Sequence, residues 1–167
     1  MKVAQVCAVD FTLYHFLLPL MKATREAGHE VVGICGEGPL AAKVRAEGIR
    51  VEAVGIDRSF NLLRHIASYR ALVRLFRRER FDIVHVHTPV ASLVGRAAAW
   101  RAKVPTVVYT AHGFYFHDRM AGWKRRLFVA LEWLAGRATD ILFTQAEEDA
   151  AFARRAKLIR GDVIEAI

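Results

Sequence analysis

The stretch Asp82-Ile83-Val84-His85-Val86 is a short, β-branched run of the length of one buried strand. A segment with helical period, Val90–Lys103, follows it, and a second β-branched run, Thr106–Thr110, comes next. A strand, a helix and another strand in this order form the unit from which parallel sheets are built. The stretch therefore predicts a parallel sheet covered by helices.

The same alternation continues along the chain and predicts an α/β fold, a Rossmann-like doubly wound, mostly parallel sheet flanked by helices, in one domain over residues 1–167. Gly28 and Gly48 stand where a left-handed C-cap would end a helix. The expected strands are Val3–Ala8, Glu30–Cys35, Arg50–Val54, Asp82–Val86, Thr106–Thr110 and Asp140–Thr144. The expected helices are Leu13–Ala27, Leu40–Glu47, Asn61–Arg80, Val90–Lys103, Gly122–Gly136 and Gln145–Lys157. The last segment, Asp162–Ile167, reads as a further strand, where we expect a second domain to begin.

Composition limits the class of protein. The hydrophobic fraction of 54% and the mean hydropathy of +0.19 exclude a disordered chain. Asp10 interrupts the apolar start, which we interpret as a strand and not a signal peptide, and charges break every run of the roughly 18 residues that a spanning helix needs. Cys7 and Cys35, the two cysteines, both fall in expected strands, which favours a reducing cytoplasm over a disulfide framework.

The net charge of +8 and the pI near 10.0 favour an anionic partner: nucleic acid, acidic lipid or phosphorylated small molecules. A solvated basic surface that serves solubility is the alternative.

Two helices combine apolar stripes with clustered cations. In the helix Asn61–Arg80 the expected core stripe is Leu62, Ile66, Tyr69, Val73 and Phe76, and the basic flank is Arg70, Arg74, Arg77 and Arg78. In the helix Gly122–Gly136 the expected packing stripe is Trp123, Leu127, Ala130, Leu131 and Leu134, while Phe128, Val129 and Trp133 project elsewhere beside Lys124, Arg125 and Arg126. Apolar residues next to a basic cluster favour an interfacial membrane contact by Trp123, Lys124, Arg125 and Arg126, and burial against a second domain is the alternative.

Several motifs are missing. No G-x-G-x-x-G follows the first strand and no Walker A motif occurs, which disfavours nicotinamide, flavin and P-loop chemistry. His85 and His87 share one face of a strand, so a metal pair is conceivable, but no further ligand follows at a suitable spacing. We therefore expect no metal and no cofactor, with His85 packed in the sheet and His87 lining the ligand cleft.

Ligands of open α/β sheets bind beyond the carboxyl ends of the strands. The densest polar and aromatic group there is the segment Tyr109–His117, where a His-Gly turn ends a strand and aromatic rings follow. Rings stack on sugar faces, and an imidazole donates to hydroxyls or phosphates near neutral pH. A loop that folds under its own aromatic residues is the alternative.

These residues, taken together, resemble a known family. The run Asp82–Pro89, then Gly95-Arg96, then Tyr109–Phe114 is similar to the N-terminal domain of retaining GT-B glycosyltransferases of the large family 4-like group. The likeness is greatest to transferases that extend undecaprenyl-diphosphate-linked sugars in capsule and exopolysaccharide synthesis. The resemblance covers nearly the whole chain, and the glycine pair that many members carry after the first strand is missing here.

The resemblance implies that two Rossmann-like domains face each other across a cleft, of which this chain contains only the N-terminal, acceptor-binding one. His112 would be the catalytic contact with the donor sugar or the reacting centre. The remaining expected substrate contacts are Asp10, Phe11, Thr12, His87, Thr88, Gly113 and Phe114.

The partners implied are a nucleotide diphosphate sugar, which is a substrate and not a cofactor, a lipid-linked glycan acceptor, and the C-terminal donor domain or a partner subunit. The expected location is the cytoplasm, at the inner face of the plasma membrane, in peripheral contact with anionic lipid. We expect sugar transfer with retained configuration, and no activity from this chain alone. The rival hypotheses are a subunit of a split transferase and a basic nucleic-acid-binding module, the latter resting on charge alone.

Overall fold

A computed structural model describes residues 1–57, 62–116 and 120–167. In these residues the strands form one seven-stranded sheet of order β3-β2-β1-β4-β5-β6-β7, and every pairing is parallel. The strands are β1 (Lys2–Val6), β2 (Glu30–Cys35), β3 (Arg50–Ala53), β4 (Ile83–His87), β5 (Thr106–Ala111), β6 (Ile141–Thr144) and β7 (Val163–Ala166). The predicted doubly wound, Rossmann-like α/β fold is confirmed.

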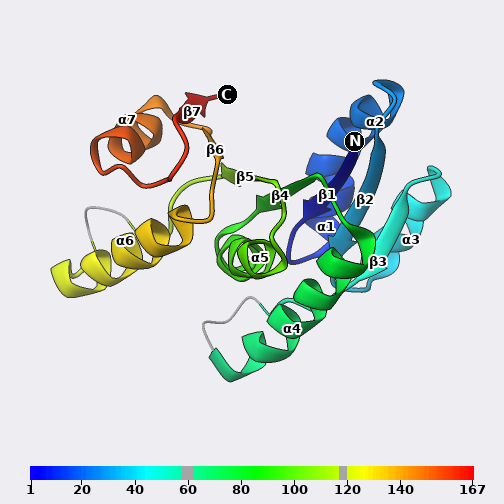
Figure 1. Ribbon diagram of the computed structural model, residues 1–167, viewed down its shortest axis with the longest axis horizontal. Coiled ribbons are helices and arrows are strands. Elements are labelled where there is room, and N and C mark those ends of the chain that lie inside the picture. Colours follow the sequence, from blue (N-terminus) through cyan, green and yellow to red (C-terminus); the bar gives the residue numbers. More distant parts are fainter. Residues whose placement is uncertain (58–61, 117–119) are drawn as a thin grey trace.

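Helices connect the strands. They are α1 (Asp10–Thr12), the π-helical turn η1 (Leu13–Leu17), α2 (Leu18–Glu26), α3 (Pro39–Ala46), α4 (Leu62–Glu79), α5 (Pro89–Ala102), α6 (Gly122–Gly136) and α7 (Glu147–Arg155). Figure 1 shows α4, α5 and α6 in a row along one side of the sheet, while α2 lies on the other side. The predicted start of the fourth long helix at Asn61 lies outside the described residues.

Two hydrophobic cores hold the helices on the sheet. On one face, η1, α2 and α3 bury Leu13, Met21 and Val44 against β2 and β3. On the other face, α4 and α5 bury Leu72 and Phe76, among others, against the centre of the sheet. Chain reversal depends locally on glycine: Gly28 and Gly48 have φ values of +82° and +76°, which confirms the predicted left-handed positions.

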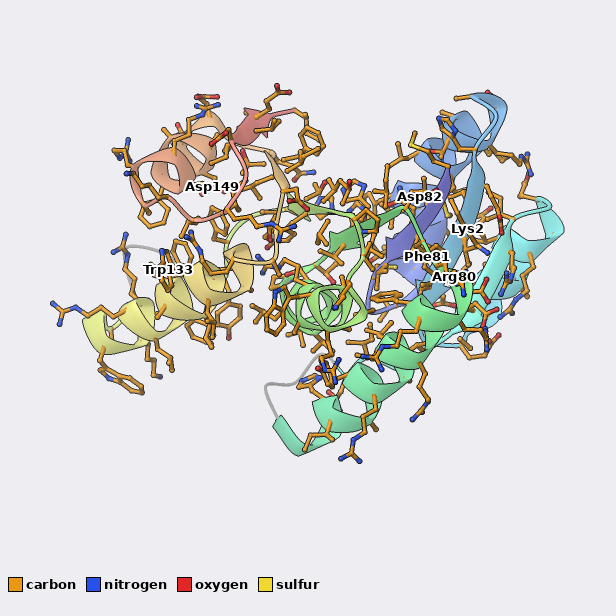
Figure 2. All side chains as sticks on the ribbon, in the orientation of Figure 1. Lys2, Arg80, Phe81, Asp82, Trp133 and Asp149 are labelled. Atoms are coloured by element: carbon orange, nitrogen blue, oxygen red, sulfur yellow. The ribbon has the colours of Figure 1, made fainter. Side chains whose placement is uncertain are left out.

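Ion pairs tie the amino edge of the sheet together. The backbone N–H of Lys2 donates to the Asp82 carboxylate at 2.6 Å, and the Lys2 ammonium lies 5.6 Å from the centre of the Phe81 ring (Figure 2). Glu79, at the end of α4, accepts hydrogen bonds from Arg50, Lys2 and Arg78, which hold the pKa of its carboxyl well below its ordinary value. Part of the positive charge of the chain is therefore neutralised here.

The predicted stripe of α4 is confirmed in part, since Val73 and Phe76 are buried and Tyr69 packs against the core. Ile66, an expected core residue, is 43% exposed, whereas Ser68 and Leu72 are buried with Phe76. The Ser68 hydroxyl donates to the carbonyl of Gly55 at 2.5 Å, so a polar contact fixes a face that an apolar pattern does not show. The predicted basic flank is confirmed, since Arg70, Arg74 and Arg77 are exposed.

The packing face predicted for α6 is wrong. Trp123, Leu127, Ala130 and Leu134 are exposed, and only Leu131 of the predicted stripe is half-buried. The inward face instead carries Phe128, Val129, Glu132, Ala135 and Gly136. Apolar residues surround this helix, so periodicity does not select one face, and the buried Arg96 of α5 draws the only carboxylate of α6, Glu132, inward.

Candidate functional site

The candidate site lies at the carboxyl edge of three adjacent strands. In the sheet β1 pairs with β2 on one side and with β4 on the other, and β5 pairs with β4. The order of the strands therefore reverses at β1 and β4, which is where parallel α/β sheets open a ligand crevice. Because the strands are parallel, the turn after β1 and the His112 turn after β5 open on one edge, as predicted.

Three imidazoles form a row at this edge, and we call His85, His87 and His112 the histidine column. The ring centres of His85 and His87 lie 4.1 Å apart, and those of His87 and His112 lie 5.7 Å apart. His85 and His87 point to the same face of β4 because side chains alternate along a strand. His112 adds a third ring, from the turn after the neighbouring strand.

Hydrogen bonds orient the two inner rings. His85 Nε2 and the Thr110 hydroxyl are 2.7 Å apart. His87 Nε2 lies 2.8 Å from the carbonyl oxygen of the Gln5 side chain and therefore donates to it. In the neutral ring this bond leaves His87 Nδ1 as a hydrogen-bond acceptor.

Burial keeps the histidine column uncharged. It lowers the pKa of His85 to about 4 and that of His87 well below its ordinary value, because neither charged ring would be solvated. Desolvation also lowers the pKa of His112, which is the exposed member. A neutral His112 ring carries one donor and one acceptor, so it can bind a hydroxyl or stabilise a developing negative charge.

Two buried polar atoms at the end of β4 have no hydrogen-bond partner among the described residues. They are Nδ1 of His87 and the hydroxyl of Thr88. His87 is only 2% exposed, so the expectation that it lines an open cleft is wrong, and the ring lies beneath the surface next to His112. Thr88 has a φ of +65°, and backbone strain of this kind concentrates at functional sites.

In the turn after β1, the carboxylate of Asp10 makes a structural hydrogen bond. Asp10 accepts the backbone N–H of Leu40 at 2.9 Å, in the first turn of α3. The N-cap residue of α3 is Gly38, which has no side chain, and Pro39 has no N–H, so Asp10 supplies the cap from another element. One oxygen of the carboxylate accepts this bond, which joins α1 to α3, and the expected contact of Asp10 with substrate stays a prediction.

The two residues that follow Asp10 differ in exposure. Phe11 is 52% exposed, and its ring lies 4.4 Å from that of His15 and 6.1 Å from that of Phe16. Thr12 is half-buried. Phe11 therefore presents an open aromatic face near the carboxyl edge.

The turn after β5 exposes His112 and packs the ring of Phe114 against the core. Gly113 has a φ of +106°, a conformation that suits glycine. Phe114 is half-buried, stacks on Phe116 with ring centres 5.0 Å apart and packs against the main core, and its contact with substrate stays a prediction. Hydrophobic burial of the ring fixes the turn that carries His112. The last residue of the predicted aromatic segment, His117, lies outside the described residues.

The predicted membrane contacts divide into two groups. Trp123, Lys124 and Arg126 are exposed on α6. Arg125 is half-buried, with its guanidinium 5.6 Å from the centre of the Phe152 ring of α7. Because Arg125 packs on the Phe152 ring, it does not belong to the exposed basic cluster.

Sequence reasoning missed a buried ion pair. Arg96, 1% exposed, donates to Glu132 of α6 at 2.7 Å, and its guanidinium lies 4.2 Å from the centre of the Tyr109 ring. Gln5, which orients His87, was also missed. A signal for Gln5 was its polar amide inside a buried strand, since buried polar groups require partners.

In the described part of the chain no group of three or more His, Cys, Asp or Glu residues could hold a metal ion. Within that same part, no helix combines the length and the hydropathy that crossing a membrane demands.

Comparison with known proteins identifies a family and several relatives of this chain. The profile of a family described as "Glycosyl transferase 4-like domain" matches residues 15–167. The Bacillus subtilis protein EpsD, provisionally named a glycosyltransferase, is 34% identical over 154 residues, which cover 89% of this chain and 38% of EpsD. The Escherichia coli UDP-Gal:alpha-D-GlcNAc-diphosphoundecaprenol alpha-1,3-galactosyltransferase is 35% identical over 92 residues, which cover 55% of this chain and 24% of that enzyme. The chain thus spans well under half the length of both proteins.

Solved structures share the fold. HepE of Anabaena, in complex with UDP and glucose, superimposes with a TM-score of 0.70 at 18% identity, over 100% of this chain and 44% of HepE. The UDP-GlcNAc 2-epimerase of Neisseria meningitidis, bound to UDP-GlcNAc, gives a TM-score of 0.68 at 15% identity, over 94% of this chain and 44% of the epimerase. Because proteins with different activities share this fold, the fold alone does not select a reaction.

Proposed function

The chain belongs to the family of glycosyl transferase 4-like domains, and from this premise we propose that it is the acceptor-binding domain of a glycosyltransferase. The proposed reaction moves a sugar from a nucleotide diphosphate sugar to a hydroxyl of a lipid-linked glycan, with retention of the anomeric configuration. The reacting groups meet at the carboxyl edge beside His112. The nucleotide sugar is supported by the UDP in HepE, and the lipid-linked acceptor by the name of the E. coli relative.

One observation supports this proposal most strongly: an exposed, neutral imidazole stands next to the point where the strand order reverses. His112 lies beside the buried His87 and follows β5, one strand from β4 and two from β1. The stacked rings of Phe114 and Phe116 hold the turn that carries His112. A preorganised donor in this position costs no reorganisation when charge develops in the transition state.

In the proposed reaction, His112 donates one hydrogen bond. As the bond between the sugar and the diphosphate breaks, negative charge develops on the leaving diphosphate, while the acceptor hydroxyl bonds to the anomeric carbon and loses its proton to that diphosphate. A hydrogen bond from His112 to a group that gains charge contributes about 3 kcal/mol to transition-state stabilisation. The open ring of Phe11 is suited to stacking on a sugar face. Gly113 and Thr88 then shape the backbone around the acceptor.

We propose further that this chain alone does not transfer sugar. It spans 38% or less of the relatives described above. The resemblance to GT-B transferases implies a donor site in a second domain. Without that domain the reactants lose proximity and orientation, which contribute roughly 7 kcal/mol or more to such reactions. A separate catalytic subunit that supplies the donor site would be the alternative arrangement.

A transfer assay tests the function. A longer protein that contains this sequence is incubated with radiolabelled UDP-sugars and a lipid-linked N-acetylglucosamine acceptor, and NMR of the product gives its anomeric configuration. The proposal expects a labelled lipid with retained configuration and no turnover by the 167-residue chain. Inverted product would contradict retention, and robust turnover by the 167-residue chain would contradict the two-domain arrangement. Activity that appears only when a second polypeptide is added would favour the split enzyme.

A further inference from the structure

A cavity of about 250 Å³ lies at the amino edge of the sheet, opposite the edge that carries His112. Its walls come from the end of α5, from β5, from the turn before β6 and from the loop before β7. The lining residues are Trp100, Lys103, Val104, Val107, Ala138 and Arg160. Because all strands of the sheet are parallel, the cavity is separate from the proposed transfer site.

Trp100 supplies an aromatic surface to this cavity. Its side chain is 65% exposed in the last turn of α5, whereas Val104, Val107 and Ala138 of the same cavity are buried. A large aromatic ring that faces solvent gives up the stability that burial would bring. Its open face can stack on another flat ring, and nucleobases of any sequence stack on tryptophan in this way.

The charges of the cavity add up to an excess of one cation. Arg160 pairs with one oxygen of Asp140 at 2.8 Å, and the other oxygen of Asp140 accepts the backbone N–H of Val107 at 2.8 Å. This pair is neutral as a unit and holds the guanidinium of Arg160 in place. Lys103 is exposed and forms no ion pair with the described residues, so its ammonium supplies the excess charge. A phosphate oxygen would accept charge-assisted hydrogen bonds from both cations.

The backbone places Lys103 in a left-handed conformation. Its φ is +60°, at the end of α5, where glycine is the residue that fits without strain. The N–H of Lys103 donates to the carbonyl of Trp100 at 3.1 Å, which fixes the two residues relative to each other. Arg80 and Lys157 have the same left-handed backbone at the ends of α4 and α7, so this edge of the sheet is basic. Of these three cations, Lys103 is the one that lines the cavity.

From these observations we propose that the cavity binds a nucleoside monophosphate, with the base on Trp100 and the phosphate on Lys103 and Arg160. The indole selects a flat ring, and the excess charge selects an anion. A volume slightly below the roughly 300 Å³ of the smallest ordinary ligand pockets fits a small ligand that stays partly in solvent. Binding here is independent of the proposed transfer reaction, which uses the opposite edge.

Tryptophan fluorescence tests the site on the 167-residue chain. In the variant W123F/W133F, Trp100 is the only tryptophan. UMP quenches its emission, because the base stacks on the indole, and uridine binds at least about tenfold more weakly, because it lacks the phosphate. His112→Ala in the same background leaves the UMP titration unchanged. Absence of quenching by UMP, equal affinities for UMP and uridine, or loss of binding in His112→Ala would overturn the proposal.

Substitutions of Lys103 separate binding from folding. Lys103→Ser lowers the affinity for UMP about tenfold, since it removes one charged hydrogen bond. The matched control Arg101→Ser removes the same charge from an exposed position of α5 and changes the affinity by less than about twofold. Lys103→Gly also removes the ammonium but relaxes the left-handed backbone, so the affinity falls while the urea midpoint rises. Equal losses in Lys103→Ser and Arg101→Ser, or full affinity in Lys103→Gly, would contradict the site.

Discussion

The histidine column and the outward side of α6, which carries Trp123, Leu127 and Leu134, depart in opposite ways from the rule that polar side chains lie at the surface and apolar ones in the core. In the column, polar rings are buried: His85 is 9% exposed and His87 is 2% exposed. On the outward side of α6, large apolar side chains face solvent, with Trp123 67% exposed. Burial of a polar group and exposure of an apolar patch both cost stability, so folding alone does not explain either place. The inward side of the same helix, in contrast, is held by a buried ion pair.

The inward side of α6 provides the largest test of this comparison. Glu132→Gln removes the carboxylate that pairs with Arg96 and leaves a buried guanidinium without a counter-charge. We expect the free energy of unfolding to fall by about 3–5 kcal/mol, measured by urea denaturation. The outward substitution Leu134→Ser, on an exposed side chain, should change it by less than about 0.5 kcal/mol.

A double variant tells whether the loss of stability comes from the unpaired charge or from lost packing. Arg96→Met combined with Glu132→Leu replaces both charges with apolar groups, and it should be more stable than Glu132→Gln. If Glu132→Gln were as stable as the unchanged protein, α6 would not be held by this ion pair, and the contrast between its two sides would disappear.

The histidine column predicts a dependence of stability on pH. The folded-state pKa of His85 is about 4, and an unfolded histidine has a pKa near its ordinary value of about 6.5. Between these values the unfolded chain binds more protons, so the free energy of unfolding falls as the pH drops from 7 to 5, by about 2 kcal/mol from His85 alone. His87 acts in the same direction because its pKa is lowered too.

His85→Gln should flatten this dependence by about that amount in urea titrations at pH 7 and pH 5. His29→Gln, in the turn before β2, removes a histidine that lies away from the column and serves as the matched control. An identical slope in His85→Gln would mean that the ring binds protons equally in the folded and the unfolded chain, in conflict with its burial.

Local patterns predicted the elements and the edge of the site. The bounds of β2 and α6 agree with the predicted Glu30–Cys35 and Gly122–Gly136, since β-branched runs and glycines mark such ends within a few residues. The edge that carries His112 followed from the parallel sheet. The resemblance to retaining GT-B enzymes supplied the role of His112, which stays a prediction.

Contacts between distant residues were beyond local patterns. The contact of Asp10 with Leu40 joins residues 30 positions apart, and the pair of Arg96 with Glu132 joins residues 36 apart. The first gives Asp10 a structural contact, and the second turns α6 so that the predicted packing stripe faces outward. Both outcomes depend on a partner in another element, whose position only the folded chain specifies.

The most direct test of the central claim is the effect of His112→Ala on sugar transfer by a longer protein that contains this sequence. The account predicts that kcat falls about a hundredfold, because the lost hydrogen bond contributes about 3 kcal/mol, while circular dichroism and the urea midpoint stay unchanged. His29→Ala, at the opposite edge of the sheet, should keep full activity. A well-folded His112→Ala enzyme with undiminished kcat would contradict the assignment of the site.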